Sequence, residues 1–185
     1  MTDTLDLSQN RNPDRGAPRR LTLQPQALTA ATFAPYGAIV QAGNQTPIII
    51  NEGNTERFHA MAEVELAEAA DKAVISIFSG QPRTMPMTIK MLERHPLGSQ
   101  FFQPLSNEPY LVLVAPGAEV PDLDQLTLFL AQPNQGVQYS RNTWHHPLLA
   151  LNKPCDFLVV DREGDGDNLE EFFFPGDIQV EIQLS

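Results

Sequence analysis

The sequence has 185 residues, 42% of them hydrophobic, and a formal net charge of −11 at pH 7. This length and composition suit one globular domain with a full-sized core, whereas the acidic charge excludes nucleic acids and anionic membranes as partners, since both require a basic face. We therefore expect a small-molecule substrate. If that substrate is an anion, its site must supply a local cluster of Arg, Lys or metal ion.

The single cysteine and the short apolar runs indicate where in the cell the protein is located. Cys155 cannot form an intramolecular disulfide, so nothing ties the chain to an oxidising compartment. The longest apolar runs, such as residues 111–115, are far shorter than the ~20 residues of a membrane-spanning helix. The N-terminus is polar rather than signal-like. We expect a soluble, cytoplasmic protein.

The N-terminal residues 1–20 contain four of the nine arginines and almost no apolar side chains. Such a segment cannot offset its ordering entropy by burial, so it is predicted to be a disordered or loosely packed extension. The remaining residues, 21–185, are predicted to form a single domain.

From residue 21 onward, short segments rich in Val, Ile, Phe and Tyr alternate with Pro, Gly and Asn, which is typical of many short strands. A helical pattern is found at residues 25–31, while residues 62–70 favour a helix by propensity but also alternate like a strand, so that segment stays undecided. The expected strands are residues 38–41, 48–51, 74–79, 84–94, 100–103, 110–115, 127–131, 136–140, 157–161 and 178–184.

These short strands must close into a barrel or pack as a sandwich to hide their edges. We predict an all-β fold, a cupin-like jelly-roll β-barrel with a few short helices.

The segment ERHPLGSQ (residues 93–100) is the first candidate for chemistry, because the common nucleotide-binding, thiol and nucleophile signatures are absent. Glu93 and His95 are two residues apart on an expected strand, so their side chains share a face. Gln100 follows a turn and could add an oxygen ligand. This pattern loosely resembles the first cupin motif and suits a divalent ion such as nickel, manganese or iron. A solvated Glu and His at a strand end is an equally frequent alternative.

The segment RNTWHHP (residues 141–147) carries two adjacent histidines, which cannot share a face of one strand. We choose His145 as the residue that enters the lumen, because the Trp-His step resembles the second cupin motif. His146 is then a hydrogen-bonded structural residue. A structural role is also the alternative for His145.

The segment NEGNTERFHAMAE (residues 51–63) places Arg57, His59 and Glu63 on one alternating face. Arg57 is a candidate for holding a substrate carboxylate, because a guanidinium binds two oxygens at once. The alternative is a surface arginine paired with Glu56 or Glu63.

Taken together, INEGNTERFHAMA, MTIKMLERHPLGSQFFQPL and GVQYSRNTWHHPLLAL followed by DFLVVDR resemble the ureidoglycolate lyase family. The similarity runs from roughly residue 21 to residue 162, and Lys90 departs from it where a related lyase has histidine. The resemblance implies a homodimeric cytosolic cupin of allantoin and purine degradation, which cleaves ureidoglycolate to glyoxylate and urea. It also implies a divalent metal, nickel first, as a candidate cofactor.

Expulsion of urea requires removal of the hydroxyl proton, delivery of a proton to the leaving nitrogen, and an anchor for the carboxylate. If no metal binds, His95 or His145 is the base. The expected catalytic residues are His59, Glu93, His95, Tyr139 and His145; the expected substrate-binding residues are Asn51, Arg57, Arg94 and Arg141; the expected metal ligands are Glu93, His95, Gln100 and His145.

Two other functions are compatible with the same residues. One is hydrolysis of ureidoglycolate with release of ammonia, which needs an activated water. The other is a cupin that binds a small carboxylate without catalysis.

Overall fold

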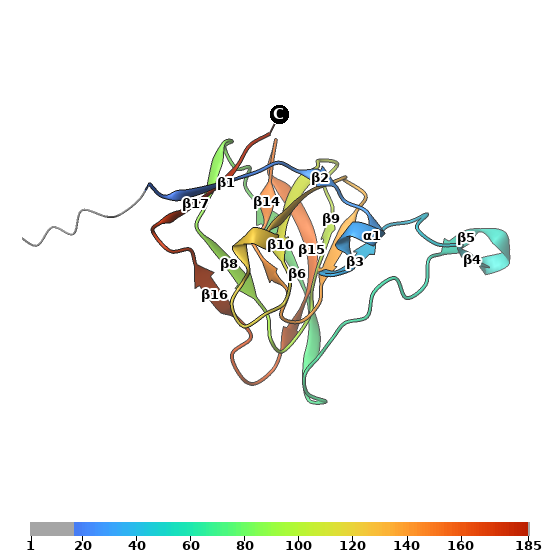
Figure 1. The fold of residues 1–185 in the computed structure, drawn as a ribbon. Helices are drawn as coiled ribbons and strands as arrows, with labels where there is room; N and C mark the ends of the chain where they lie inside the picture. The colour runs from blue at the N-terminus through green and yellow to red at the C-terminus, as the bar shows by residue number, and fades with distance from the viewer. Residues whose placement is uncertain (1–16, 185) are drawn as a thin grey trace, which may run out of the picture.

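The computed structural model describes residues 17–184, which are built mostly of β-strands (Figure 1). The extension predicted for residues 1–20 lies outside this range except for its last four residues, and Arg19 already begins the first strand, β1. Within the described range, no helix is long and apolar enough to cross a membrane.

The largest sheet has the strand order β16–β8–β13–β10–β11–β2, with β14 also paired to β10. Its central strand β10 is buried along its whole length, which explains the continuous apolar run seen there in the sequence. The bounds are β2 (Gln26–Ala27), β8 (Met91–Arg94), β10 (Tyr110–Ala115), β11 (Thr127–Ala131), β13 (Trp144–His145), β14 (Leu149–Ala150) and β16 (Glu170–Phe173).

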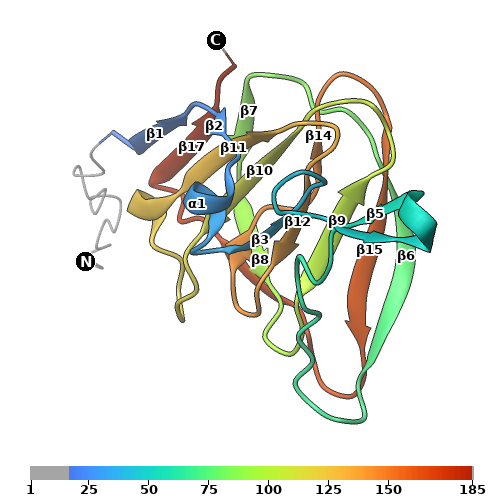
Figure 2. The same cartoon turned by 90° about the vertical axis from the view of Figure 1, so that its right-hand side faces the viewer.

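A second sheet, here called the five-stranded sheet, has the order β3–β12–β9–β15–β6, and all its neighbours are antiparallel. Its inner face packs against the largest sheet: Phe102 and Phe157 share one buried cluster with Val112 and Phe129. Figure 2 shows β10 and β11 on one side and β9, β15 and β6 on the other. The bounds are β3 (Gly37–Val40), β6 (Lys72–Gly80), β9 (Gln100–Pro104), β12 (Gly136–Tyr139) and β15 (Cys155–Glu163).

A three-stranded sheet covers the other face of the largest sheet. It has the order β1–β17–β7, with bounds β1 (Arg19–Leu23), β7 (Met87–Ile89) and β17 (Ile178–Ile182). Ile89, Val180 and Ile182 pack there against Leu92 and Leu113. The layered, strand-rich architecture confirms the predicted all-β, cupin-like fold class.

The structure contradicts one local prediction and decides one segment that the sequence leaves open. The helix expected at residues 25–31 is wrong: Gln26–Ala27 form β2, and the short helix α1 (Ala30–Phe33) starts later, where Thr29 and Thr32 form a capping box. Residues 62–70 form no helix, because the backbone hydrogen bonds of Glu65 and Ala67 go to the turn at residues 97–99. Tertiary pairing therefore overrides helix propensity in that segment.

Expected strand 84–94 is divided into β7 and β8, and several short strands were not predicted. Among these is β5 (Thr55–Arg57), which pairs with β4 (Ile48–Ile50) around the 3₁₀ turn η1 (Asn51–Gly53). This hairpin projects from the body of the molecule (Figure 1). Residues 45–59 are called the arm below. A second 3₁₀ turn, η2 (Leu123–Gln125), precedes β11.

The turn between β8 and β9 depends on a glycine. A Cβ on Gly98 would lie 2.5 Å from the Cβ of Arg162, whose guanidinium is fixed by two 2.6 Å contacts with Asp71. We expect Gly98→Ala to lower the free energy of unfolding by about 1–3 kcal/mol, as overpacking does. Chemical denaturation measures this change. The control is Gly176→Ala, whose Cβ would meet open space; an equal loss in both variants would contradict the packing argument.

Candidate active site

The centre of the site is a pair of residues brought together by strand pairing. β8 and β13 are antiparallel neighbours in which Glu93 lies opposite His145. The Nε2 atom of His145 is 3.5 Å from a carboxylate oxygen of Glu93 and 3.2 Å from the amide oxygen of Gln100, which reaches across from β9. The largest sheet and the five-stranded sheet thus both contribute to the cluster.

The imidazoles of His95 and His145 are held in the same way. Nδ1 of His95 is 2.6 Å from the carbonyl oxygen of Asn168, and Nδ1 of His145 is 3.0 Å from that of Thr143. A carbonyl only accepts, so each Nδ1 carries a proton and donates it. Nε2 of His95 is the one buried side-chain nitrogen or oxygen without a partner in the described chain.

This arrangement has the properties of a metal site. One ligand atom from each of Glu93, His95 and His145 can be chosen so that all lie within 4.8 Å of one another. Backbone carbonyls that orient the imidazoles through Nδ1 are the usual outer partners of ligating histidines. Nitrogen and carboxylate ligands without thiolate suit nickel, manganese or iron. The predicted ligands, including Gln100, are therefore brought together, and their chemistry fits a divalent cation.

Charge and burial set the protonation of these groups. Burial raises the pKa of Glu93, but the contact with His145 and the charges of the neighbouring histidines outweigh it, and the net pKa is lowered. Burial and the nearby His145 lower the pKa of His95. Near neutral pH, Glu93 is therefore ionised and His95 is a neutral imidazole.

Tyr139 forms one wall of the cluster. Its ring stacks on that of His145, with centroids 4.1 Å apart and planes 11° apart. Burial, followed by the charge of Glu93, raises the pKa of Tyr139 well above its ordinary value. The phenol therefore stays protonated and can donate a hydrogen bond but cannot act as a base.

A cavity of about 600 Å³ opens beside Glu93 between the two main sheets. Arg83 lies at its edge, on a segment fixed by a backbone hydrogen bond from Arg83 N to Ala150 O. Burial is the main cause of the lowered pKa of His146, and the charge of Arg83 also contributes to it. The lining residues are Phe78, Ser79, Gly80, Gln81, Arg83, Glu93, Gln100, Phe102, Pro147 and Leu148.

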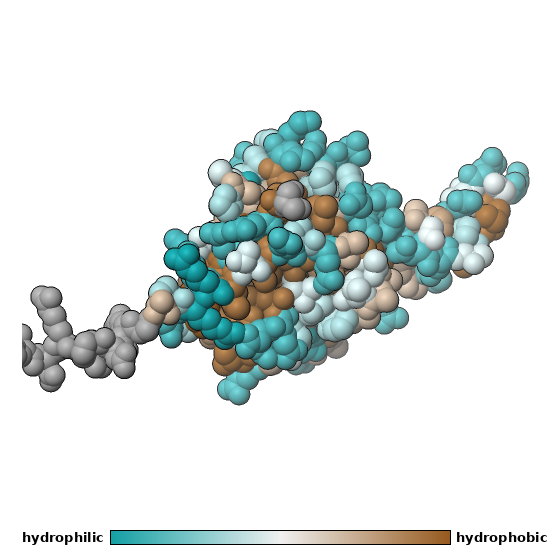
Figure 3. Space-filling view, turned by 45° about the horizontal axis from the view of Figure 1, so that its top comes forward, coloured by the Kyte–Doolittle hydropathy of each residue, from teal (hydrophilic) through white to brown (hydrophobic). Residues whose placement is uncertain are grey.

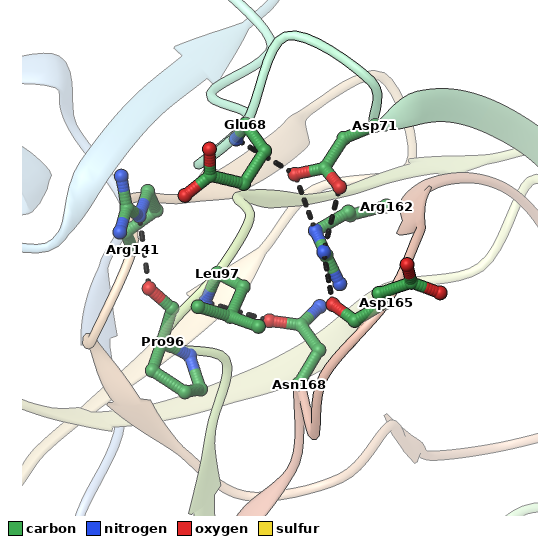
Figure 4. Close-up of polar contacts among 8 residues, drawn as sticks. All are labelled: Glu68, Asp71, Pro96, Leu97, Arg141, Arg162, Asp165 and Asn168. Carbon is green, nitrogen blue, oxygen red and sulfur yellow. Dashed lines mark hydrogen bonds and ion pairs between the residues drawn. The ribbon is translucent and has the colours of Figure 1, made fainter.

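Several predicted site residues are held elsewhere in the chain. Arg94 forms an ion pair with Glu170 and lies 4.7 Å above the ring of Trp144. Arg141 is exposed and donates from Nε to the carbonyl of Pro96, and Figure 4 shows this contact beside the Asp71–Arg162 pair. Neither arginine lines the cavity beside Glu93.

Asn51, Arg57 and His59 lie on the arm and are exposed. Arg57 forms no ion pair with Glu56 or Glu63; its guanidinium contacts Nδ1 of His59 at 2.9 Å. Within one chain these three residues line neither cavity that includes Glu93. His146 is buried and donates from Nδ1 to Pro147 O, in agreement with a structural role.

Two residues of the site were not predicted from the sequence. Burial raises the pKa of Asp161, and the neighbouring Gln100 lowers it in part. The sequence does contain a signal for Asp161. It follows the buried Phe157 and Val159 at the two-residue spacing of β15, so its side chain points to the same face of the strand. Arg83 lies in a loop between Pro82 and Pro86, where no periodicity indicates which way a side chain points.

Comparison with known proteins gives consistent results. A family model described as ureidoglycolate lyase matches residues 20–181. The chain is 47% identical over 156 residues to a ureidoglycolate lyase of Pseudomonas syringae pv. syringae (strain B728a), covering 84% of this chain and 91% of that protein. It is 48% identical over 159 residues to one of Pseudomonas aeruginosa (strain UCBPP-PA14), covering 86% and 94%. A third, of Azotobacter vinelandii (strain DJ / ATCC BAA-1303), is 46% identical over 162 residues, covering 88% and 96%.

Metal binding can be tested directly on the purified protein. We expect Ni²⁺ to bind with one high-affinity site per chain and His95→Ala to weaken binding by at least about 100-fold, since even outer-shell partners account for ~10–100-fold. Titration calorimetry after chelation measures both. The control is His146→Asn, which keeps a donor near Pro147 O and removes an imidazole outside the cluster; equal affinity in wild type and His95→Ala would exclude this ligand set.

Proposed function

The chain belongs to the ureidoglycolate lyase family, and we propose that the cavity beside Glu93 is where it cleaves ureidoglycolate to glyoxylate and urea. The supporting observation is that ionised Glu93, the amide of Gln100 and the cation of Arg83 line one cavity, and that His95 and His145 cluster around Glu93. Ureidoglycolate carries a carboxylate, a hydroxyl and a ureido nitrogen on one carbon. Each of these groups has a chemical counterpart in the cavity.

Arg83 is the proposed anchor for the substrate carboxylate. Among the arginines of residues 17–184, it alone lines this cavity, and a guanidinium binds a carboxylate through two parallel hydrogen bonds. Its field also offsets the charge of Glu93, which would otherwise repel an anion. This assignment replaces Arg57 and Arg141 as the anchor within the same chain.

Glu93 and His145 are the proposed proton-transfer pair. Glu93 lines the cavity and is ionised, so it can accept the hydroxyl proton. The Nε2 atom of His145 lies 3.5 Å from the same carboxylate. The oxygen electrons then form the carbonyl of glyoxylate as the carbon–nitrogen bond breaks, and its electrons go to nitrogen. The proton held by Glu93 passes to that nitrogen, which releases urea and restores the carboxylate.

Glu93, His95 and His145, with the amide oxygen of Gln100, are the proposed ligands of a divalent metal, with nickel as the first candidate. When bound, such an ion would lower the pKa of the substrate hydroxyl. The carboxylate of Asp161 neighbours Gln100, whose amide oxygen is directed at His145, so we assign Asp161 a positioning role.

The assembly and location proposed for the enzyme are a homodimer in the cytoplasm. The buried free thiol of Cys155 supports a reducing compartment. Hydrolysis with release of ammonia and carboxylate binding without turnover are less well supported, because the family match and the relatives indicate a lyase.

The reaction is tested by identifying its products. We expect purified protein with racemic ureidoglycolate to yield glyoxylate and urea in equal amounts, and Glu93→Gln to lower kcat by ~100-fold or more because the proton acceptor is lost. Coupled assays for glyoxylate, urea and ammonia measure this. Ammonia in place of urea would show the hydrolase, and undiminished kcat in Glu93→Gln would remove Glu93 from the mechanism.

The carboxylate anchor is tested by comparing two arginines. We expect Arg83→Gln to raise KM by about 10–100-fold, the equivalent of one charge-assisted hydrogen-bonding group, whereas Arg141→Gln leaves KM near the wild-type value. Steady-state kinetics on both variants decide between them. The reverse pattern would return the anchor to Arg141.

A further inference from the structure

The arm, residues 45–59, makes few contacts with the body of its own chain. It is a two-stranded hairpin of three residue pairs, from Ile48–Arg57 to Ile50–Thr55, and its base is closed by a hydrogen bond from Gln45 to the carbonyl of His59. An isolated two-stranded hairpin is marginally stable at best in water. Its apolar side chains are also unprotected: Ile48 is 50% exposed and Ile49 57% exposed. Figure 3 shows hydrophobic side chains at the far end of this projection.

The backbone at the tip of the arm also departs from the favoured regions. Asn51 and Glu52 have φ values of 52° and 59°, in the left-handed region that residues other than glycine rarely adopt, and Ala60, directly after the arm, has a φ of 51°. Such conformations persist where surrounding structure determines them. The body of the same chain does not surround the tip of the arm (Figure 1), so contact with a second surface would supply this constraint.

A matching apolar surface exists on the outer face of the five-stranded sheet. Within the described part of the chain its edge strand β6 pairs only with β15, and the outward side chains Ile75 and Ile77 are 73% and 58% exposed. Beside them, a hollow of about 270 Å³ lies between Phe101 and Val160 of the same face and the chain's own segment 58–64, which contributes Phe58, Ala60, Met61, Ala62 and Val64 to its lining. A long apolar edge strand is a template for pairing with another chain.

The unprotected arm and the unprotected sheet face belong to the same chain, so a two-fold symmetric pair buries both surfaces at once. We propose that the arm of each chain docks on the outer face of the five-stranded sheet in a second copy, and that it brings Arg57 and His59 to the mouth of the partner's catalytic cavity. The two surfaces are connected by β6, because Phe78, Ser79 and Gly80 at its end line that cavity.

The guanidinium of Arg57 is available to bind an anion. Its guanidinium is exposed and contacts only His59 among the polar side chains of the described chain, so its charge is not neutralised by a carboxylate. A cavity that contains Glu93 and has Asp161 close behind it gains a second cation from this contact. Arm exchange would also explain how Asn51, Arg57 and His59, which the sequence predicts as site residues, reach a cavity that they do not line within one chain.

The inference rests on the proposed function, because its main test uses lyase activity. The test is complementation between two variants, Glu93→Gln and Arg57→Ala, each of which we expect to be inactive as a homodimer. In a heterodimer with exchanged arms, one site carries both substitutions and the other carries neither, so activity returns to about half of the wild-type value per dimer. Co-expression with two different affinity tags, followed by tandem purification, isolates the heterodimer.

Each outcome of this test supports or contradicts a specific proposal. About half of the wild-type activity supports the exchanged arm; a heterodimer as inactive as its parents, or a fully active Arg57→Ala homodimer, overturns it. An inactive wild-type enzyme would instead contradict the proposed function.

The docking surface has a second readout that is independent of activity. We expect the wild type to be a dimer by light scattering and the variant Ile48→Asp/Ile49→Asp to be monomeric. The control is Val120→Asp, an equally exposed residue outside both surfaces (56%) that should leave the dimer intact. A monomeric wild type, or an arm variant that remains dimeric, overturns the proposal.

Discussion

The register between β8 and β13 is the constraint on which the rest of the site depends. It opposes Glu93 to His145 and directs both to the space between the two main sheets, while Leu92, one residue away, packs into the core on the other face. Because side chains alternate along a strand, a slip by one residue would exchange these faces, burying a carboxylate among aliphatic side chains and exposing leucine. The stability of the core and the geometry of the site are therefore fixed by the same hydrogen-bond ladder.

Burial of this many polar groups is costly unless their hydrogen bonds are satisfied. The chain achieves this with backbone carbonyls at Asn168 and Thr143 and with the reciprocal contacts of Glu93, Gln100 and Asp161. Nε2 of His95 remains without a partner. An unsatisfied buried acceptor is a source of instability in a structural role but is expected of a ligand atom. The energetic argument and the chemical argument therefore indicate the same function for this imidazole.

The part of the site that follows strand periodicity could be predicted from the sequence. Glu93 and His95 share a face by spacing, and His145 was chosen over His146 by alternation and a Trp-His step. Two kinds of information were missing. Arg83 lies in a proline-flanked loop, where the direction of a side chain depends on packing with residues distant in sequence. Residues 62–70 favour a helix locally, but their backbone groups pair with the turn at 97–99, and such a tertiary contact leaves no local signal.

The overall charge places one more demand on the site. At −11, the chain repels an anionic substrate at long range, and Glu93 and Asp161 do so at short range. Arg83 offsets part of this field, but it is one cation at an exposed edge, where solvent screens its charge. A divalent metal on the imidazoles and an arginine carried by a second chain would each add positive charge where water is excluded, and charges act most strongly at low dielectric. Metal ligation and arm exchange would therefore both offset the negative charge that opposes binding of an anionic substrate, and the two effects can act together.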